Sequence, residues 1–210
     1  MGFTRYSLVI GILIILSACV IENPLGKNNT NVVEIENKVN VTYQVHGLID
    51  YSVYWDLKTF IENIKDPKNT NLIIEFNSQG GLMEFGVSIK RSILQFKDRG
   101  GIVTAIVKND SKCESLCSVL FPLGDKRYAG ENSHWLFHSP KFPKSVVIRQ
   151  WHLDEIEKYR KFMIENIQIV DPEFAQYLID NKIIVQSGDH YFTGLEVSKI
   201  AKKFLVIKDL

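Results

Sequence analysis

Hydrophobic residues recur along this chain at two different spacings. Short runs that alternate, or that are apolar throughout and rich in β-branched residues, predict strands at residues 41–49, 72–76, 102–107 and 133–138, with 183–186 as a further candidate. Stripes with helical spacing predict helices at residues 54–64, 85–96, 115–121, 153–167, 171–179 and 194–203. Strands that alternate with helices indicate βαβ units. The expected fold is therefore α/β, with a mainly parallel sheet flanked by helices.

The start of the chain has a different pattern, in which one positive charge precedes a single apolar run. Arg5 stands before the run at residues 8–16, and the run leads into Leu-Ser-Ala-Cys, which ends at Cys19. A membrane-spanning helix needs roughly 20 apolar residues, so this run is too short to remain as one. It predicts a secretory signal at residues 1–18 that is removed on export.

The tetrapeptide that ends at Cys19 resembles the bacterial lipobox, in which the cysteine is acylated and becomes the new N-terminus. We therefore expect a lipoprotein anchored in the bacterial cell envelope, facing the periplasm or the exterior. An ordinary signal peptide with a chance cysteine is the alternative. Residues 19–40 are rich in Asn and charge and predict a tether, followed by one folded domain at residues 41–210.

Charge and cysteine content narrow the class of protein further. The chain has 25 basic and 24 acidic residues, and this balance gives no electrostatic footprint for nucleic acid. Lipidation of one of the three cysteines would leave Cys113 and Cys117 as a pair in an oxidising compartment, which favours a disulfide. A metal site shared with a histidine and two free thiols are alternatives, although two ligands are too few for structural zinc. We expect no cofactor and no metal.

Three segments combine chemistry with a position at the end of a predicted strand. Residues 77–81 read Asn-Ser-Gln-Gly-Gly, residues 113–117 read Cys-Glu-Ser-Leu-Cys, and residues 136–140 read Leu-Phe-His-Ser-Pro. Loops at the carboxyl ends of parallel strands are where α/β folds place their sites. The three segments are therefore expected to meet at one edge of the sheet.

In this order and spacing, the segments resemble the Clp-type serine proteases of the Clp/crotonase fold. That family has an Asn-Ser-Pro-Gly-Gly turn, a serine that opens a helix, a histidine at a strand end, and a later aspartate before a Phe-x-(Ser/Thr)-Ala-x-Glu-Ala helix. The matching stretch for the aspartate is 189–197, and 123–129 resembles a further family segment. The intervals of 23 residues from Ser115 to His138 and 51 from His138 to Asp189 are close to those of the family. The resemblance covers residues 42–207.

The resemblance implies a role for each matched residue. Ser115 would be the nucleophile, His138 the general base, and Asp189 the group that orients the imidazole. The N–H of Leu116 and one N–H from the pair Gly80 and Gly81 would form the oxyanion hole.

Several features depart from the family pattern or leave alternatives open. Gln79 replaces the usual proline, and Glu114 adjoins the nucleophile where the family prefers a small apolar residue. The Cys-x-Ser-x-Cys arrangement resembles an exported branch of Clp-like proteins. Other candidates for the third triad residue and for a Ser-Lys mechanism are Asp171, Asp180, Lys112 and Lys126.

These observations favour a membrane-anchored serine peptidase that cleaves peptides or unfolded protein segments. Cytoplasmic members of the family receive substrates from an ATP-driven unfoldase, and the envelope offers no such energy source, so the substrate would already be small or extended. A Clp-fold lipoprotein with a degraded site, acting as a binding or scaffold module, is the alternative. The acyl-CoA branch of the fold is a third hypothesis. Whether copies assemble into a homo-oligomer stays open.

Overall fold

The computed structural model describes residues 38–142, 145–186 and 188–210, and these residues form one compact unit. The predicted signal segment, Cys19 and nearly all of the predicted tether lie outside the described residues. The strands are β1 (Val39–Ile49), β2 (Thr70–Gly81), β3 (Ile102–Val107), β4 (Lys112–Glu114), β5 (Lys126–Ala129), β6 (His134–Phe137), β7 (His190–Thr193) and β8 (Val206–Ile207). The α-helices are α1 (Tyr51–Glu62), α2 (Met83–Asp98), α3 (Leu116–Leu120), α4 (Gln150–Val170), α5 (Pro172–Asp180) and α6 (Gly194–Ile200), and two 3-10 turns are η1 (Pro67–Asn69) and η2 (Phe121–Leu123).

The strands form one eight-stranded sheet in the order β7-β6-β4-β2-β3-β5-β8, with β1 paired to β2. All the described pairings are parallel except that of β6 with β7. The start of β2 pairs with β1 and β3, and its far end pairs with β1 and β4. The predicted α/β fold with a mainly parallel sheet is confirmed.

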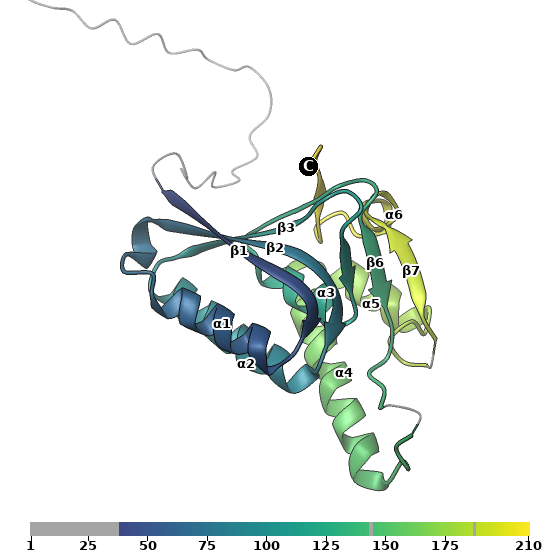
Figure 1. Cartoon of the computed structure of the whole chain (residues 1–210). Helices are drawn as coiled ribbons and strands as arrows, with labels where there is room; N and C mark the ends of the chain where they lie inside the picture. The colour runs from purple at the N-terminus through teal and green to yellow at the C-terminus, as the bar shows by residue number, and fades with distance from the viewer. Residues whose placement is uncertain (1–37, 143–144, 187) are drawn as a thin grey trace, which may run out of the picture. The chain divides into compact units, whose positions relative to one another are not determined.

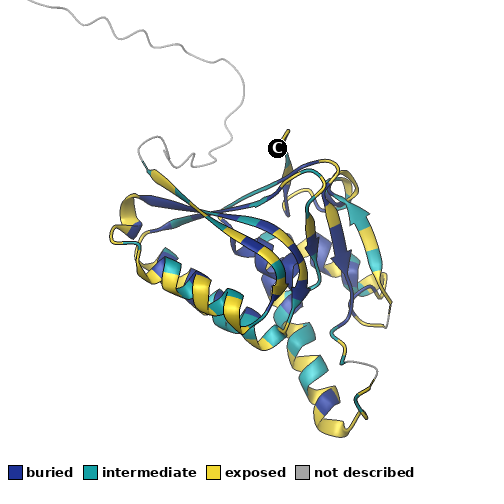
Figure 2. Cartoon of the chain, in the orientation of Figure 1, coloured by how far each residue is buried: buried dark blue, intermediate teal, exposed yellow. Residues whose placement is uncertain are grey.

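The sequence determines where helix α1 begins. In α1 the side chain of Asp50 accepts hydrogen bonds from the N–H groups of Ser52 and Val53, which caps the first turn. α1 and α2 lie beside each other along β1–β3, and α4 extends beyond the body of the sheet (Figure 1). Figure 2 shows the same helices exposed on their outer faces, while β6 is largely buried.

An aromatic cluster fills the core beneath β6. Trp135 and Phe137 are fully buried and contact Phe121, Phe174 and Phe204 at ring distances of 4.9–6.1 Å, within the range of favourable aromatic pairs. The indole N–H of Trp135 donates to Ser133 Oγ at 2.9 Å, so this buried polar group is satisfied. The two aromatic side chains of β6, Trp135 and Phe137, therefore belong to the core.

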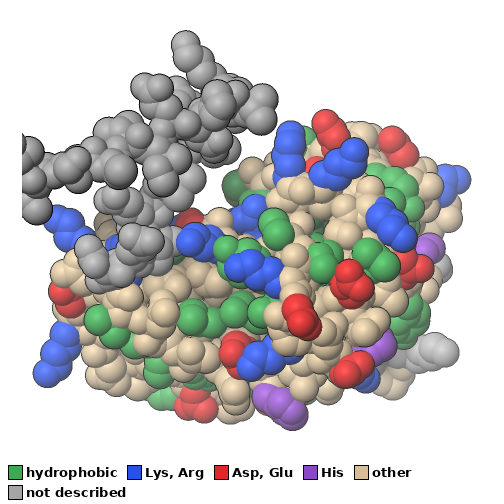
Figure 3. Space-filling model, turned by 90° about the horizontal axis from the view of Figure 1, so that it is seen from above, with side chains coloured by type: hydrophobic (Ala, Val, Ile, Leu, Met, Phe, Trp, Pro, Cys, Tyr) green, Lys and Arg blue, Asp and Glu red, His purple; other side chains and the backbone are tan. Residues whose placement is uncertain are grey.

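The outer surface mixes charges of both signs. On the face seen in Figure 3, basic and acidic side chains are interspersed among hydrophobic ones. None of the helices within the described residues is long and apolar enough to cross a membrane.

The structure differs from the predicted elements at the short strands and at one turn. β2 continues through residues 77–81 rather than turning there, because this stretch pairs with β1 and with β4. The strand proposed for residues 183–186 is wrong. The N–H groups of Val185 and Gln186 bond back to the carbonyl of Lys182, which makes a local turn with Lys182 at φ 58°. β4, β5, β7 and β8 are additional strands.

Candidate active site

The candidate residues lie along one edge of the sheet because their strands are neighbours. In the order β6-β4-β2, His138 follows β6, Ser115 follows β4, and Gly80 and Gly81 end β2. β7 runs antiparallel, so its amino end, preceded by Asp189, reaches the same edge. The structure therefore brings these segments together at one edge of the sheet.

Ser115 has an unusual backbone conformation between β4 and α3, with φ 53° and ψ −119°. A non-glycine residue at positive φ costs free energy, and such residues cluster at functional sites. The conformation is held from both sides, since the N–H of Ser115 donates to Leu136 and its carbonyl accepts from Ser118 Oγ at 2.7 Å. A sharp strand-to-helix turn of this kind exposes a serine hydroxyl at the top of a sheet.

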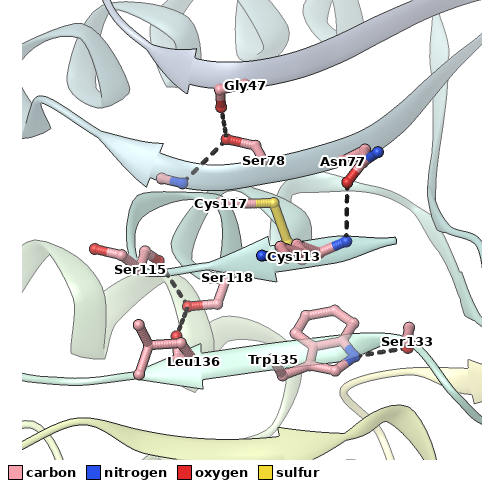
Figure 4. The surroundings of a disulfide bond; sticks show 12 residues. Gly47, Asn77, Ser78, Cys113, Ser115, Cys117, Ser118, Ser133, Trp135 and Leu136 are labelled. Carbon is pink, nitrogen blue, oxygen red and sulfur yellow. Dashed lines mark hydrogen bonds between the residues drawn. A yellow bond between two sulfur atoms is a disulfide. The ribbon is translucent and has the colours of Figure 1, made fainter. Parts of the chain in front are cut away.

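Cys113 and Cys117 are joined across this turn, with Sγ atoms 2.10 Å apart (Figure 4). Both cysteines are fully buried. The pair begins in β4 and ends in α3, so the bond closes a short ring around Ser115. Within the described residues, no cluster of three or more His, Cys, Asp or Glu side chains is arranged to hold a metal.

His138 is buried and hydrogen-bonds through both ring nitrogens. Nε2 lies 2.8 Å from Ser115 Oγ, and Nδ1 lies 2.7 Å from the carbonyl oxygen of Ser139. A carbonyl oxygen only accepts, so Nδ1 carries the proton and Nε2 is free to accept the proton of Ser115. The imidazole is therefore held in the tautomer that a general base requires.

Gly80 brings β2 close to the serine turn. Its φ is +88°, and a Cβ there would lie 2.7 Å from Ser115 Cβ and 2.9 Å from the nitrogen of Leu116, so only glycine fits. The N–H of Gly80 donates to Ser78 Oγ at 3.0 Å and is therefore already engaged. Ser78 in turn donates to the carbonyl of Gly47 at 2.6 Å.

The N–H of Gly81 is the better donor of the glycine pair. Leu82 donates its N–H to Ile49, the residue that pairs with Gly81 in the parallel register. In a parallel pair of strands, a residue hydrogen-bonds to the residues before and after its partner and not to the partner itself. The N–H of Gly81, the partner of Ile49, therefore points away from β1. That side of β2 faces β4 and the turn at Leu116. The sequence predicts one donor from this pair of glycines, and the hydrogen bonds of the structure favour Gly81.

Asp189 makes no hydrogen bond to His138 among the described contacts, which corrects the prediction of a His-to-Asp hydrogen bond. The carboxylate is 40% exposed and pairs with Lys141 Nζ at 2.8 Å. The hydrogen bond and charge of Lys141 lower the pKa of Asp189, with smaller contributions from His138 and His190. The site therefore contains a Ser-His pair, with Asp189 near enough to affect it only through its charge.

The other candidates weighed from the sequence have positions away from the Ser-His pair. Asp171 is buried and caps α5 through the N–H of Phe174, while its second oxygen accepts from the N–H of Lys203. Asp180 accepts from Gln176 on the exposed side of α5. Lys126 lies on β5, which β2 and β3 separate from β4. Neither it nor Lys112 hydrogen-bonds to Ser115 among the described contacts.

A cavity of about 230 Å³ opens directly beside the pair. Ser115 and His138 line it together with residues of α2 and α4. Its polar lining includes Glu84, Lys141 and Glu155, whereas Glu114 is not part of it. Ser78, Ser118, Lys141 and the carbonyl of Ser139 support the site without having been predicted, because a single serine, lysine or main-chain carbonyl carries no pattern that marks it.

Comparison with known proteins places the fold. The arrangement is that of an α/β protein with a Ser-His pair at the carboxyl edge of a parallel sheet. The chain matches no protein-family model and no curated protein. Among solved structures it is similar to a mutant of ClpP1 from Listeria monocytogenes, with 18% sequence identity and a TM-score of 0.65; the match covers 84% of this chain and 94% of the other. At this identity the likeness shows a Clp-like fold.

Proposed function

We propose that this chain is a serine peptidase that cleaves peptides or unfolded protein segments, with Ser115 as the nucleophile and His138 as the general base. The observation that carries the proposal is the 2.8 Å contact between Ser115 Oγ and His138 Nε2 at a serine held at positive φ. A serine hydroxyl is a weak nucleophile unless a positioned base accepts its proton. The adjoining cavity and the likeness to ClpP1 in fold support the same reading.

In the acylation step, the Oγ–C bond forms as the serine proton passes to Nε2 of His138. The C–N bond then breaks, and the imidazolium returns that proton to the leaving amine. In deacylation, water adds to the acyl carbon and the Oγ–C bond breaks. One water proton passes through His138 back to Ser115. The N–H groups of Leu116 and Gly81 are the donors that we assign to the oxyanion.

Asp189 has an electrostatic part in this proposal. It carries a negative charge near His138 and so favours the imidazolium that forms during the reaction, although Lys141 neutralises much of that charge. The carbonyl of Ser139 keeps the imidazole in its tautomer, which is the task that a triad carboxylate usually performs.

We further propose that the enzyme is a lipoprotein of the cell envelope, held through Cys19. The apolar run before Leu-Ser-Ala-Cys supports export and acylation, and the Cys113–Cys117 bond suits an oxidising compartment.

An activity-based fluorophosphonate probe tests the proposal directly. The parent protein should be labelled at Ser115, as mapped by peptide mass analysis, and Ser115→Ala should abolish both labelling and peptide hydrolysis. Ser139→Ala is the matched control, because its main-chain carbonyl, not its side chain, contacts His138; labelling should persist. A folded parent protein that is neither labelled nor active would favour the scaffold alternative, for which the missing contact between His138 and Asp189 is the supporting observation.

A further inference from the structure

The cavity beside Ser115 combines an apolar wall with two carboxylates. The apolar part comes from Met83 on α2 and from Ile156 and Met163 on α4, of which Met163 is almost fully buried. The volume of about 230 Å³ is roughly that of seven or eight water molecules, enough for one long side chain. A ligand group in this cavity is therefore a single side chain rather than a whole peptide segment.

The carboxylates belong to Glu84, in the first turn of α2, and Glu155, on α4. Among the described residues, neither side chain takes part in an ion pair. The cation that also lines the cavity, Lys141, is already paired with Asp189. The cavity therefore carries uncompensated negative charge within reach of the nucleophile.

Tyr159 shows that both carboxylates act on the same small space. This residue lies on α4 and lines the cavity together with the two acids. Burial raises the pKa of the Tyr159 phenol, and the charges of Glu155 and Glu84 raise it further. A group that enters the cavity is thus exposed to both charges at once.

We propose that this cavity selects a substrate residue with a long apolar stem and a cationic head, lysine or arginine, on the acyl side of the scissile bond. The stem packs against Met83, Ile156 and Met163, and the head lies between Glu84 and Glu155. An acidic side chain is repelled by both carboxylates, and a purely apolar one leaves them without a partner while displacing their water. This inference rests on the proposed peptidase function and adds the class of substrate to it.

Two matched peptidyl diphenyl phosphonates test the selectivity, one with lysine next to the phosphorus and one with norleucine. The two side chains share the same stem length, and norleucine lacks the ammonium group. In each reaction the Ser115 Oγ–P bond forms, one P–O bond to a phenoxy group breaks, and phenol leaves with the serine proton. The lysine probe should modify Ser115 about tenfold faster at low salt, and the preference should shrink as ionic strength rises.

The double variant Glu84→Gln and Glu155→Gln should bring the ratio of the two rates close to one. The control variant Glu62→Gln and Asp154→Asn removes two exposed carboxylates outside the cavity and should keep the parent ratio. Modification at equal rates by both probes, or a ratio that the Glu84 and Glu155 changes leave intact, overturns the selectivity but not the peptidase. If a generic fluorophosphonate also fails to label Ser115, both proposals are overturned together.

Discussion

At the residue scale, the orientation of His138 depends on a main-chain group. A carboxylate that performs this task can be removed by substitution, whereas the carbonyl of Ser139 is present whatever residue stands at that position. The hydrogen bond that orients the imidazole also needs no distant element, because its acceptor belongs to the next residue in the chain. The Ser-His pair is in this respect less dependent on the rest of the fold than a full triad.

Asp189→Asn provides the residue-scale test of this arrangement. The charge of an exposed, lysine-paired carboxylate contributes at most about 1 kcal/mol, so kcat/KM should fall about fivefold or less. His138→Ala should reduce it by roughly 10³-fold or more, because the general base is lost. Steady-state kinetics on one peptide substrate gives both values.

The pH profile adds a second readout for the same variant. Lys141 lowers the pKa of Asp189, so the carboxylate is still ionised at a pH equal to the ordinary pKa of an aspartate. Its charge is lost only as the pH falls through the lowered pKa. Asp189 therefore adds no titration of its own to the acid limb of the kcat/KM profile, and Asp189→Asn should keep the shape of that limb. A loss of rate far above fivefold would restore Asp189 to the orienting role in a triad.

At the element scale, the site depends on how closely the end of β2 approaches the turn between β4 and α3. Gly80→Ala should destabilise the fold by at least about 1–2 kcal/mol through its positive φ alone. The added Cβ also meets the carbonyl of Glu114 at 2.6 Å, so the turn at Ser115 must move. The rate of fluorophosphonate labelling per folded molecule should fall more than about tenfold, since small displacements of a nucleophile are costly.

Gly47→Ala is the matched control for this prediction. Gly47 also has a positive φ, +74°, but a Cβ there meets no atom within 4 Å. Its stability should fall by about 1–2 kcal/mol, as judged by urea unfolding, while labelling stays within about twofold of the parent. Equal effects of the two substitutions on labelling would show that the close approach of Gly80 does not position Ser115.

Long elements were predictable from the sequence, and short ones were not. The stripes of α2 and α4 span several turns, so their periodicity is strong, and β2 and β3 contain apolar runs rich in β-branched residues. β4 has three residues, which is too few to establish an alternation of two. At residues 183–186 a strand was predicted where none exists. Ile183 and Ile184 are buried, but they belong to a turn.

The site was predictable where order along the chain corresponds to order in space. Ser115, His138 and the glycines follow strands that are neighbours in the sheet, so their proximity follows from the topology. The pairing of Asp189 with Lys141 depends on side-chain competition between groups 48 residues apart, which spacing cannot reveal. Glu84 and Glu155 lie on different helices, and the sequence offers no sign that they share a cavity.

At the scale of the whole molecule, the proposed lipidation at Cys19 would determine where the proposed peptidase domain works. Intact-mass analysis of the protein from the membrane fraction should show an acylated cysteine as the first residue of the processed chain. Cys19→Ala should leave the membrane fraction or remain unprocessed, while purified, folded protein keeps its labelling at Ser115. A processed Cys19→Ala protein that stays anchored would contradict the lipid attachment without affecting the peptidase proposal.

Because Cys113 and Cys117 are completely buried, the order of disulfide formation and folding matters. Thiol–disulfide exchange needs direct access to sulfur, so oxidation has to occur before the core closes over the two side chains. Once closed, the bond is out of reach of dissolved reductants unless the region opens. A molecule that folds before oxidation keeps two buried thiols and is heavier than the oxidised form by two hydrogen atoms. It then persists as a separate population. Timing during maturation, rather than conditions met later, then determines which form each molecule takes.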